Sequence, residues 1–338
     1  MPTLQENISL KHYNTFGVEA KAKYFVEAKS ENDLLEILEN NTAKTEKLLI
    51  LGGGSNMLFT ENFNGLVLKV GISGITYTIQ GDDVLLTAGA GVIWNDLVNY
   101  CVENGFAGME NLSLIPGTVG ASPIQNIGAY GVELKDIFTS CTAFEIATGK
   151  INTFTYEDCK FGYRDSVFKN ELKGKYIITS VTFHLSKTAN LKTHYGAITT
   201  ELVARGIDKP TIADIAKVVS AIRVSKLPDP KTIGNAGSFF KNPIISQSDF
   251  RILSANFPDV VNFPVGNNEV KLAAGWLIEQ CGFKGIIVGQ TGTWKNQALV
   301  LVNHGNASGH EVYNFSEQII KTVHAKFNVK LEREVNIL

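Results

Sequence analysis

The spacing of apolar residues along the first 70 positions predicts a strand, a helix and further strands. The stretch ENDLLEILEN (31–40) has apolar residues at helical spacing directly behind Ser30, a residue type that caps helix N-termini. The apolar runs KLLIL (47–51) and LVLKV (66–70) have the length of short buried strands. The N-terminal part of the chain is therefore expected to contain both element types.

A β-rich region follows. The run DVLLTAGAG (83–91) predicts a strand that leads into a helix, VIWNDLVNYCVEN (92–104), and Gly105 can close that helix because glycine accepts a left-handed backbone. The stretch CTAFEIATGKINTFTY (141–156) predicts a hairpin with Thr148 and Gly149 near its turn. The run KYIITSVTFHL (175–185) predicts another strand.

The second half of the chain alternates between helix and strand. TIADIAKVVSAIRV (211–224) predicts an amphipathic helix whose apolar face includes Ile215 and Val219, and it runs into SKLPDPKTIGNAG, the expected domain boundary. Ser308 and Glu311 form a capping box ahead of a long helix. Three shorter runs predict a helix (KLAAGWLIEQCG, 271–282) and two strands (GIIVG, 285–289, and QALVLVN, 297–303). Alternation in VKLEREVNIL (329–338) predicts a closing strand, so the fold class is mixed α+β.

Composition narrows the possible functions. The chain has 338 residues, 44% hydrophobic and 19% charged, which supports a buried core in two or three domains. With a net charge of −2, the chain lacks the excess of basic residues that binding to nucleic acid or to an anionic membrane would favour. Cysteines and histidines are dispersed without metal-binding spacing, and no apolar run is long enough to span a bilayer. We expect a cytoplasmic monomer with no metal, no nucleic-acid partner and no membrane partner.

Two glycine-rich stretches are candidate ligand loops. LLILGGGSNMLF follows a strand, and LIPGTVGASPIQNIGAYGVEL (114–134) combines glycines with other small residues. Glycines let a ligand approach the backbone closely, and successive N–H groups can bind an anion. Taken alone, the first stretch fits a tight turn as well as a phosphate loop, and the second fits a compact surface loop. Neither stretch has the Gly-Lys-Ser/Thr of a P-loop, so the pair favours a flavin dinucleotide over ATP.

Three further residues are candidates for chemistry. Arg164 in FGYRDSVFK lies among aromatic residues, which suits an anion contact and equally an ordinary ion pair. Ser238 in NAGSFFKNP lies between a glycine and two phenylalanines, with a lysine and an asparagine beyond. The spacing of the residues around Ser238, taken alone, predicts that Ser238 merely ends a strand. Alternation alone places Glu334 on a solvated face.

These and other motifs together resemble one family. The motifs occur in the same order as in the UDP-N-acetylenolpyruvoylglucosamine reductase family of peptidoglycan synthesis, and the resemblance covers nearly the whole chain. The segment THYGAI around Tyr195 resembles the extra tyrosine-bearing loop of the type I branch. The motifs that carry the resemblance are NTFG, GGGSN, PGTVGASPIQNIGAYG, YRDSVFK, KLPDP, NAGSFFKNP, KLAAGWLIE, QALVLVN and LEREV.

The resemblance implies a flavin domain of the vanillyl-alcohol-oxidase (PCMH) type in two parts, with a C-terminal α+β substrate domain. The first part is residues 1–66 with the terminal strand 329–338, the second is 67–226 with the Tyr195 loop, and the substrate domain is 227–328. FAD is expected to bind non-covalently. The residues implied to hold it are Gly52, Gly53, Gly54, Ser55, Asn56, Pro116, Gly117, Thr118, Gly120, Ala121, Asn126, Ile127 and Gly128.

The resemblance also implies a reaction. NADPH reduces the flavin and leaves, and UDP-N-acetylglucosamine enolpyruvate then enters and is reduced to UDP-N-acetylmuramate in a ping-pong sequence. Arg164 and Glu334 would stabilise the enol-carboxylate intermediate while Ser238 donates a proton. Residues implied to contact the substrate are Tyr130, Tyr195, Lys226, Asn242, Lys284 and Gln297. Phe263 replaces a tyrosine of some relatives, which removes one nucleotide contact.

Two other functions compete with the reductase. An oxidase of the same superfamily would often tether FAD through His or Cys in the glycine-rich loops, and neither 52–56 nor 116–131 contains one. A non-catalytic nucleotide-sugar binder would be expected to lose Arg164, Ser238 or Glu334, and all three are present. The reductase is therefore the favoured function.

Overall fold

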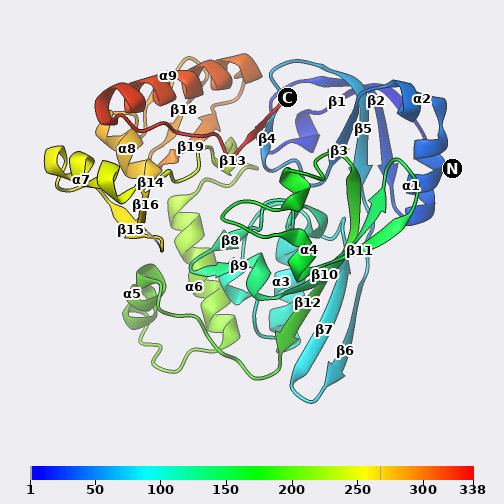
Figure 1. Ribbon diagram of the computed structural model, residues 1–338, viewed down its shortest axis with the longest axis horizontal. Helices are drawn as coiled ribbons and strands as arrows, with labels where there is room; N and C mark the ends of the chain where they lie inside the picture. The colour runs from blue at the N-terminus through cyan, green and yellow to red at the C-terminus, as the bar shows by residue number, and fades with distance from the viewer. Residues whose placement is uncertain (1, 267) are drawn as a thin grey trace. The chain divides into compact units, whose positions relative to one another are not determined.

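The chain folds into two compact units, seen in a computed structural model that describes residues 2–266 and 268–338 (Figure 1). Unit 1 comprises Met1–Ile8, Ala22–Gly53 and Asn64–Arg223. Unit 2 comprises Ser9–Lys21, Gly54–Phe63 and Val224–Leu338. Each unit is thus assembled from three separate stretches of sequence, and the glycine-rich stretch 52–56 is divided between them.

Unit 1 contains two larger sheets and a short two-stranded sheet, β8-β9. The first has the strand order β1-β2-β5-β3, and β3 runs parallel to β5. The second is antiparallel throughout, with the order β11-β10-β12-β7-β6. The strands are β1 (Gln5–Ser9), β2 (Lys21–Ala28), β3 (Leu48–Leu51), β5 (Phe63–Val70), β6 (Ile75–Gln80), β7 (Asp83–Gly89), β8 (Gly128–Ala129), β9 (Val132–Glu133), β10 (Phe138–Glu145), β11 (Ile151–Thr155) and β12 (Tyr176–Ser186).

The helices of unit 1 pack their apolar faces as the sequence predicts. Helix α1 begins behind Ser30, whose side chain accepts a hydrogen bond from the Asp33 amide. Helix α3 buries Trp94 and Leu97 in the core beside the antiparallel sheet, and Gly105 just beyond it has φ +73°. Helices α5 and α6 form a third apolar cluster. The helices are α1 (Glu31–Glu39), α2 (Asn41–Thr45), α3 (Trp94–Glu103), α4 (Tyr156–Cys159), α5 (Gly196–Ala204) and α6 (Ile212–Lys226).

Unit 2 is built on an antiparallel sheet of order β13-β19-β18-β17 and a smaller sheet of order β14-β16-β15. Helices α8 and α9 bury apolar side chains in the core that the larger sheet supplies. The strands are β4 (Met57–Leu58), β13 (Gly234–Ser238), β14 (Ile244–Ser246), β15 (Asn262–Pro264), β16 (Glu269–Leu272), β17 (Ile287–Val288), β18 (Thr291–Trp294), β19 (Gln297–Asn303) and β20 (Asn336–Ile337). The helices are α7 (Gln247–Asn256), α8 (Ala274–Gln280) and α9 (Gly309–Phe327).

Several elements differ from the sequence prediction, and helix α7 (247–256) is one that the sequence did not predict. Helix α5 covers 196–204, where the sequence indicated only a loop. Residues 269–272 form strand β16, so the helix predicted over 271–282 begins later, at Ala274. The closing strand is reduced to β20, which pairs in parallel with β4, although Val329, Leu331 and Val335 are buried as the alternation predicts. Tertiary contacts, which local sequence patterns do not encode, determined where these helices and strands begin and end.

No helix among the described residues combines the length and apolarity needed to cross a membrane. All four cysteines are free thiols, and Cys101, Cys141 and Cys159 are buried. Burial, together with the nearby Glu110 carboxylate, raises the pKa of Cys101 to about 12, so its thiol stays neutral. These cysteines are core residues.

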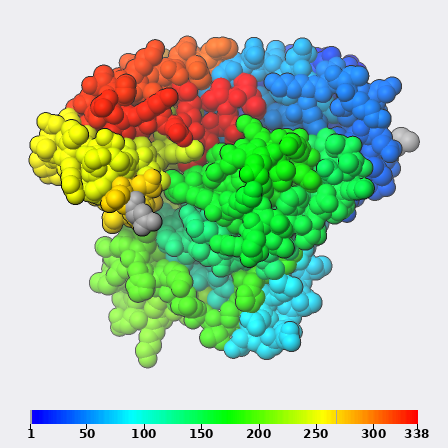
Figure 2. Space-filling model, viewed as in Figure 1, coloured from blue at the N-terminus to red at the C-terminus, as the bar shows by residue number. Residues whose placement is uncertain are grey.

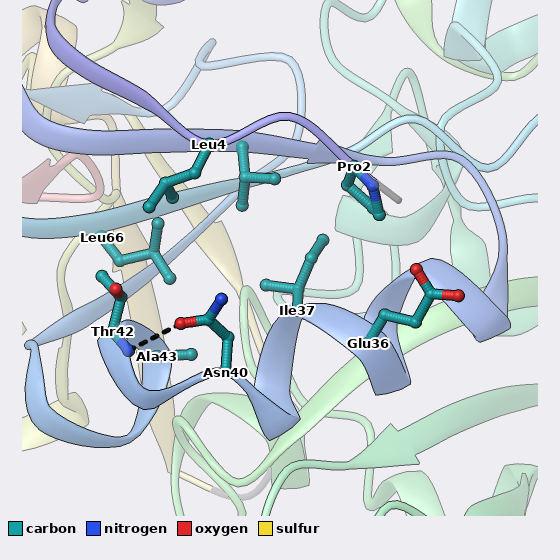
Figure 3. A pocket seen from close by; sticks show the side chains of 9 residues that line it. Pro2, Leu4, Glu36, Ile37, Asn40, Thr42, Ala43 and Leu66 are labelled. Carbon is teal, nitrogen blue, oxygen red and sulfur yellow. Dashed lines mark hydrogen bonds between the residues drawn. The ribbon is translucent and has the colours of Figure 1, made fainter.

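A small hollow lies between helices α1 and α2 and the first sheet of unit 1 (Figure 3). Its volume is about 80 Å³, and its walls include Ile37, Ala43 and Leu66. A space of this size in an apolar setting is a packing gap that holds a few atoms at most. It therefore offers no room for a nucleotide or a sugar.

The capping box of helix α9 leads to a stability prediction. The Ser308 hydroxyl accepts from the Glu311 amide, and the Glu311 carboxylate accepts from Ser308 in return. Replacing Ser308 with Ala should lower the free energy of unfolding by about 1 kcal/mol at pH 7, measured by chemical denaturation. Hydrogen bonds from Ser308 lower the pKa of Glu311 from its usual 4.5. The cap is therefore complete above that value, and the difference between wild type and variant should shrink as the pH falls below it. An unchanged difference at low pH would contradict the carboxylate's share in the cap.

Candidate functional site

The two glycine-rich loops predicted from the sequence meet within unit 1. Gly52 and Gly53 follow strand β3, and a Cβ built on Gly53 would lie 2.8 Å from the Gly117 Cα. A Cβ on Gly52 would lie 2.7 Å from the Thr118 hydroxyl oxygen. Real Cβ atoms do not approach neighbours this closely, so the two loops are in direct contact through their backbones. The structure thus brings together two stretches that are more than 60 residues apart.

Gly54 belongs to unit 2 and also requires the absence of a side chain. Its φ is +62°, and a Cβ there would lie 1.9 Å from the Tyr13 carbonyl oxygen. The Gly54 carbonyl in turn accepts from the Thr15 amide at 3.0 Å. Two backbone segments of unit 2 therefore cross at this glycine, next to the Ser55 and Asn56 that the sequence singled out.

Several residues of the second loop and its surroundings have strained backbones. Leu114, Asn126, Tyr130 and Arg164 have φ values of +60°, +44°, +50° and +54°. The left-handed conformation costs a non-glycine residue about 1–2 kcal/mol, and such residues concentrate where function demands a particular geometry. Two of these four, Tyr130 and Arg164, are residues that the sequence selected for substrate or catalytic roles. No local sequence pattern predicted these left-handed backbones.

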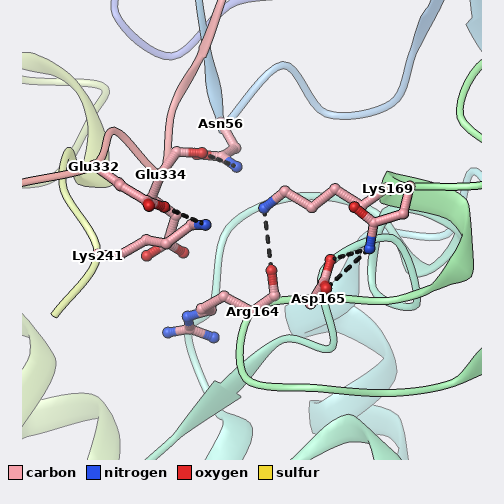
Figure 4. Close-up of polar contacts among 8 residues, drawn as sticks. Asn56, Arg164, Asp165, Lys169, Lys241, Glu332 and Glu334 are labelled. Atoms are coloured by element: carbon pink, nitrogen blue, oxygen red, sulfur yellow. Dashed lines mark hydrogen bonds and ion pairs between the residues drawn. The ribbon is translucent and has the colours of Figure 1, made fainter. Parts of the chain in front are cut away.

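Arg164 is fastened to the second glycine-rich loop. Its Nη2 donates to the Gly128 carbonyl at 3.0 Å, and its own carbonyl accepts from Lys169 Nζ at 3.1 Å (Figure 4). The side chain is half-buried. The guanidinium is therefore held beside a loop expected to bind the cofactor.

Arg223 is a candidate site residue that sequence reasoning missed. It is half-buried near the end of α6, and its Nε donates to the Leu114 carbonyl at 3.2 Å. Burial lowers the pKa of its guanidinium, the nearby Tyr130 hydroxyl opposes that effect, and the positive charge of Arg164 adds to it. Each guanidinium thus feels the positive charge of the other, and an anion bound near them would relieve that repulsion. A signal was present in the sequence, because Arg223 lies four residues after Val219, on the apolar face of the helix.

Tyr130 and Tyr195 are brought together within unit 1. Their rings form an edge-to-face pair with centroids 5.4 Å apart and an interplanar angle of 80°. Tyr195 is 48% exposed although it takes part in this contact. Burial raises the pKa of Tyr130, the Arg223 charge opposes the rise, and Tyr195 adds to it. The Tyr130 hydroxyl is therefore a neutral hydrogen-bond donor at ordinary pH.

In unit 2, a β-bulge sets the orientation of the Ser238 side chain. The pairing of β13 with β19 shifts between Asn235 and Ser238, and Gly237 in the bulge has φ +69°. The Asn235 side chain accepts from the Gly237 amide at 3.0 Å and so supports the bulge. Bulges redirect side chains at functional sites. Ser238 is half-buried, whereas the two phenylalanines after it are buried in the core of unit 2.

Glu334 lies on the segment beside Ser238. Its amide donates to the Phe239 carbonyl at 2.8 Å, and its carbonyl accepts from Asn56 Nδ2 at 3.3 Å (Figure 4). Its side chain is half-buried, while Glu332 on the same segment is exposed. Glu334 is therefore less solvated than alternation along the chain suggested, because the backbone at Phe239 lies along its own.

The other predicted substrate residues of unit 2 fall into two groups. Asn242 Oδ1 accepts from the Ala274 amide at the start of α8, and Gln297 Oε1 lies 2.7 Å from a Cβ built on Gly275. Both thus lie close to α8, and Gln297 begins β19, the strand that pairs with the Ser238 strand β13. Lys226 is exposed at the end of α6. Lys284 lies in a surface ion pair with Glu279 at 2.9 Å, and Phe263 is 46% exposed on β15.

The residues around the glycine-rich loops fit a flavin. Ile93, bridged to Thr118, is 55% exposed, and Leu114 is 37% exposed, which leaves apolar surface that a flat ring could cover. The paired guanidinium groups suit a group with partial negative charge. Asn126 is fully buried, and its side chain bonds to Glu133, Gly162 and the Lys135 amide, so it shapes the loop from within. The described residues contain no cluster of three or more potential metal ligands.

Comparison with known proteins agrees with this geometry. The model of the FAD binding domain matches residues 22–155, and the model of the UDP-N-acetylenolpyruvoylglucosamine reductase C-terminal domain matches 229–338. A UDP-N-acetylenolpyruvoylglucosamine reductase of Flavobacterium johnsoniae is 51% identical, covering 99% of both chains. One of Pseudomonas aeruginosa is 46% identical, covering 99% of this chain and 98% of its own.

Solved structures show the same fold. The Thermus caldophilus reductase superimposes with a TM-score of 0.69 at 22% identity, over 100% of this chain and 99% of its own. The expected class, a flavin-binding domain followed by a C-terminal α+β domain, is thereby confirmed. The chain belongs to the UDP-N-acetylenolpyruvoylglucosamine reductase family, whose members are FAD-dependent oxidoreductases.

Proposed function

We propose that this chain uses NADPH to reduce UDP-N-acetylglucosamine enolpyruvate to UDP-N-acetylmuramate, a cytoplasmic step of peptidoglycan synthesis. The observation that carries the proposal is the 51% identity to a named reductase over 99% of both chains, with Arg164, Ser238 and Glu334 all present. Bound FAD would supply the redox chemistry by accepting hydride from NADPH and passing it to C3 of the enolpyruvyl group in a ping-pong sequence.

The glycine-rich loops would hold the cofactor. Gly52, Gly53 and Gly117 bring two backbone segments into contact, and the small residues beyond them leave backbone groups accessible to a flat ligand. Neither loop contains the His or Cys that a covalent attachment would use, so binding would be non-covalent. The exposed side chains of Ile93 and Leu114 would lose apolar surface to the ring.

Arg164 and Glu334 would act on the negative charge that develops in the substrate. When hydride reaches C3, negative charge spreads from C2 into the enolpyruvyl carboxylate. The Arg164 guanidinium would stabilise that charge as an oriented donor. Glu334 would assist by donating through a protonated carboxyl group or through water, since an ionised carboxylate beside the charge would repel it.

Ser238 would complete the reaction by transferring its hydroxyl proton to C2. A serine hydroxyl is a weak acid, so it can donate only to a strongly basic carbon, and a relay must return a proton to it. The bulge at Gly237 supports this role, because it fixes the direction of the hydroxyl on a rigid strand. Tyr130, Tyr195, Lys226, Asn242, Lys284 and Gln297 would bind the sugar nucleotide.

Rapid kinetics test the proposal directly. The purified chain should be yellow, and denaturation should release the flavin. In anaerobic stopped-flow measurements, NADPH should bleach the flavin absorbance, and the enolpyruvyl sugar nucleotide, added next, should restore it.

Other outcomes would reject the proposal. A colourless protein that FAD cannot reconstitute excludes a flavoenzyme. Reoxidation by oxygen and not by the sugar nucleotide would point to an oxidase. Binding of the sugar nucleotide without any bleaching by NADPH would point to a non-catalytic binder.

A further inference from the structure

The buried amide of Asn111 joins two loops of unit 1. Asn111 is 1% exposed in the short 3-10 helix Glu110–Leu112. Its Nδ2 donates to the Tyr130 carbonyl at 3.1 Å and to the Lys192 carbonyl at 2.8 Å. A side-chain amide has two N–H donors, so both are used, one on each loop.

The first of these loops needs support because its backbone is strained. Tyr130 has φ +50°, and Gly131 after it has φ +81°. A left-handed tyrosine persists only where surrounding contacts hold it. The hydrogen bond from Asn111 to the Tyr130 carbonyl is one such contact, and it acts on the strained residue itself.

The second loop, 187–195, has no regular secondary structure. A hollow of about 390 Å³ borders it, with walls that include Gly131, Asn190 and Lys192. Leu191 packs against the apolar cluster of α5 and α6, whereas the side that faces the hollow has no such packing. Within the described part of the chain, the bond from Asn111 to the Lys192 carbonyl ties residues 189–192 to the rest of unit 1.

Asn111 therefore bonds to the backbone of Tyr130 and to the backbone three residues before Tyr195. The rings of the two tyrosines meet edge to face at 5.4 Å. We propose that Asn111 is a positioning residue, which sets the Tyr130–Tyr195 pair for binding the sugar nucleotide. This inference rests on the proposed function, because that function gives the two tyrosines their ligand. Asn111 itself is buried, and it would act through the two loops that its side chain joins.

The first test is a split between binding and chemistry. Asn111→Ala should raise the KM for the enolpyruvyl sugar nucleotide about tenfold, the effect expected when hydrogen bonds of ordinary strength are lost. Flavin reduction by NADPH should stay within about twofold of wild type, because a step without the sugar nucleotide does not need the tyrosine pair. Asn111→Ser, which keeps one donor and leaves a smaller cavity, repeats the test if the alanine variant does not fold.

A matched control separates positioning from loss of stability. Val98→Ala removes buried methyl groups from the core of unit 1 and should lower stability without raising the KM. In a Tyr195→Ala background, Asn111→Ala should raise the KM much less than it does alone, because the two changes act on one contact. Additive effects would overturn the proposal.

Proteolysis tests the same idea without any substrate. Lys192 is exposed, and α5, which follows the loop, lies at the surface in light green in Figure 2. Trypsin should cleave after Lys192 faster in the Asn111→Ala protein than in wild type or Val98→Ala. Unchanged cleavage, or faster cleavage with an unchanged KM, would overturn the inference. If wild-type flavin is not reoxidised by the sugar nucleotide, the proposed function fails, and the trypsin result alone then decides whether Asn111 holds the loop.

Discussion

Replacing Ser238 with Ala should slow reoxidation of the flavin by the enolpyruvyl sugar nucleotide about 10²–10⁴-fold, the usual contribution of a positioned proton donor. Reduction of the flavin by NADPH should remain nearly unchanged, because no proton reaches C2 in that half-reaction. Ser238 lies on a bulge with its strand partners on β19, so removing one hydroxyl leaves the backbone contacts in place. Anaerobic stopped-flow absorbance of the flavin measures both rates in one experiment.

Two further variants sharpen this result. Ser238→Cys keeps an acidic hydrogen at the same position and should recover part of the lost rate. Ser254→Ala on α7 makes the same chemical change elsewhere in unit 2 and should leave both half-reactions unaltered. Equal slowing of the two half-reactions in Ser238→Ala would show that Ser238 is structural and not the proton donor.

Gly54→Ala should give the second large effect, a loss of both stability and flavin. A left-handed backbone costs alanine about 1–2 kcal/mol, and forcing an atom into a packed region costs about 1–3 kcal/mol more. The added Cβ would lie 1.9 Å from the Tyr13 carbonyl oxygen, so one of the two backbone segments has to move. We expect purified protein with less FAD per chain and a lower free energy of unfolding, measured by flavin absorbance and chemical denaturation.

Gly81→Ala is the matched control. Gly81 has φ +63°, nearly that of Gly54, but a Cβ there meets nothing within 4 Å. It should therefore show the conformational cost alone and bind FAD as wild type does. If the two variants lost equal stability and equal flavin, the crossing of backbones at Gly54 would have no role in cofactor binding.

The sequence predicted many of the longer regular elements because their signals are local. Ser30 and Ser308 marked the starts of α1 and α9, and both serines cap those helices through hydrogen bonds made within one turn. Apolar runs marked β3, β12 and β19 because a buried strand needs little else. Helix α5 was missed since its apolar spacing is weak, and residues far along the chain, including those of α6, complete its buried face.

The amino-acid order by itself determined the family, the glycine-rich loops and the candidates Arg164, Ser238 and Glu334, because long motifs survive as strings of residue types. Tertiary structure alone decided that Gly53 meets Gly117, that Asn111 bonds to two distant carbonyls, and that Arg223 lies near Arg164. It also set the left-handed backbones of Tyr130 and Arg164. Such features depend on contacts between segments far apart in the chain. The strain at one residue is offset by contacts with distant residues, and the residues next to it in the sequence give no sign of those contacts.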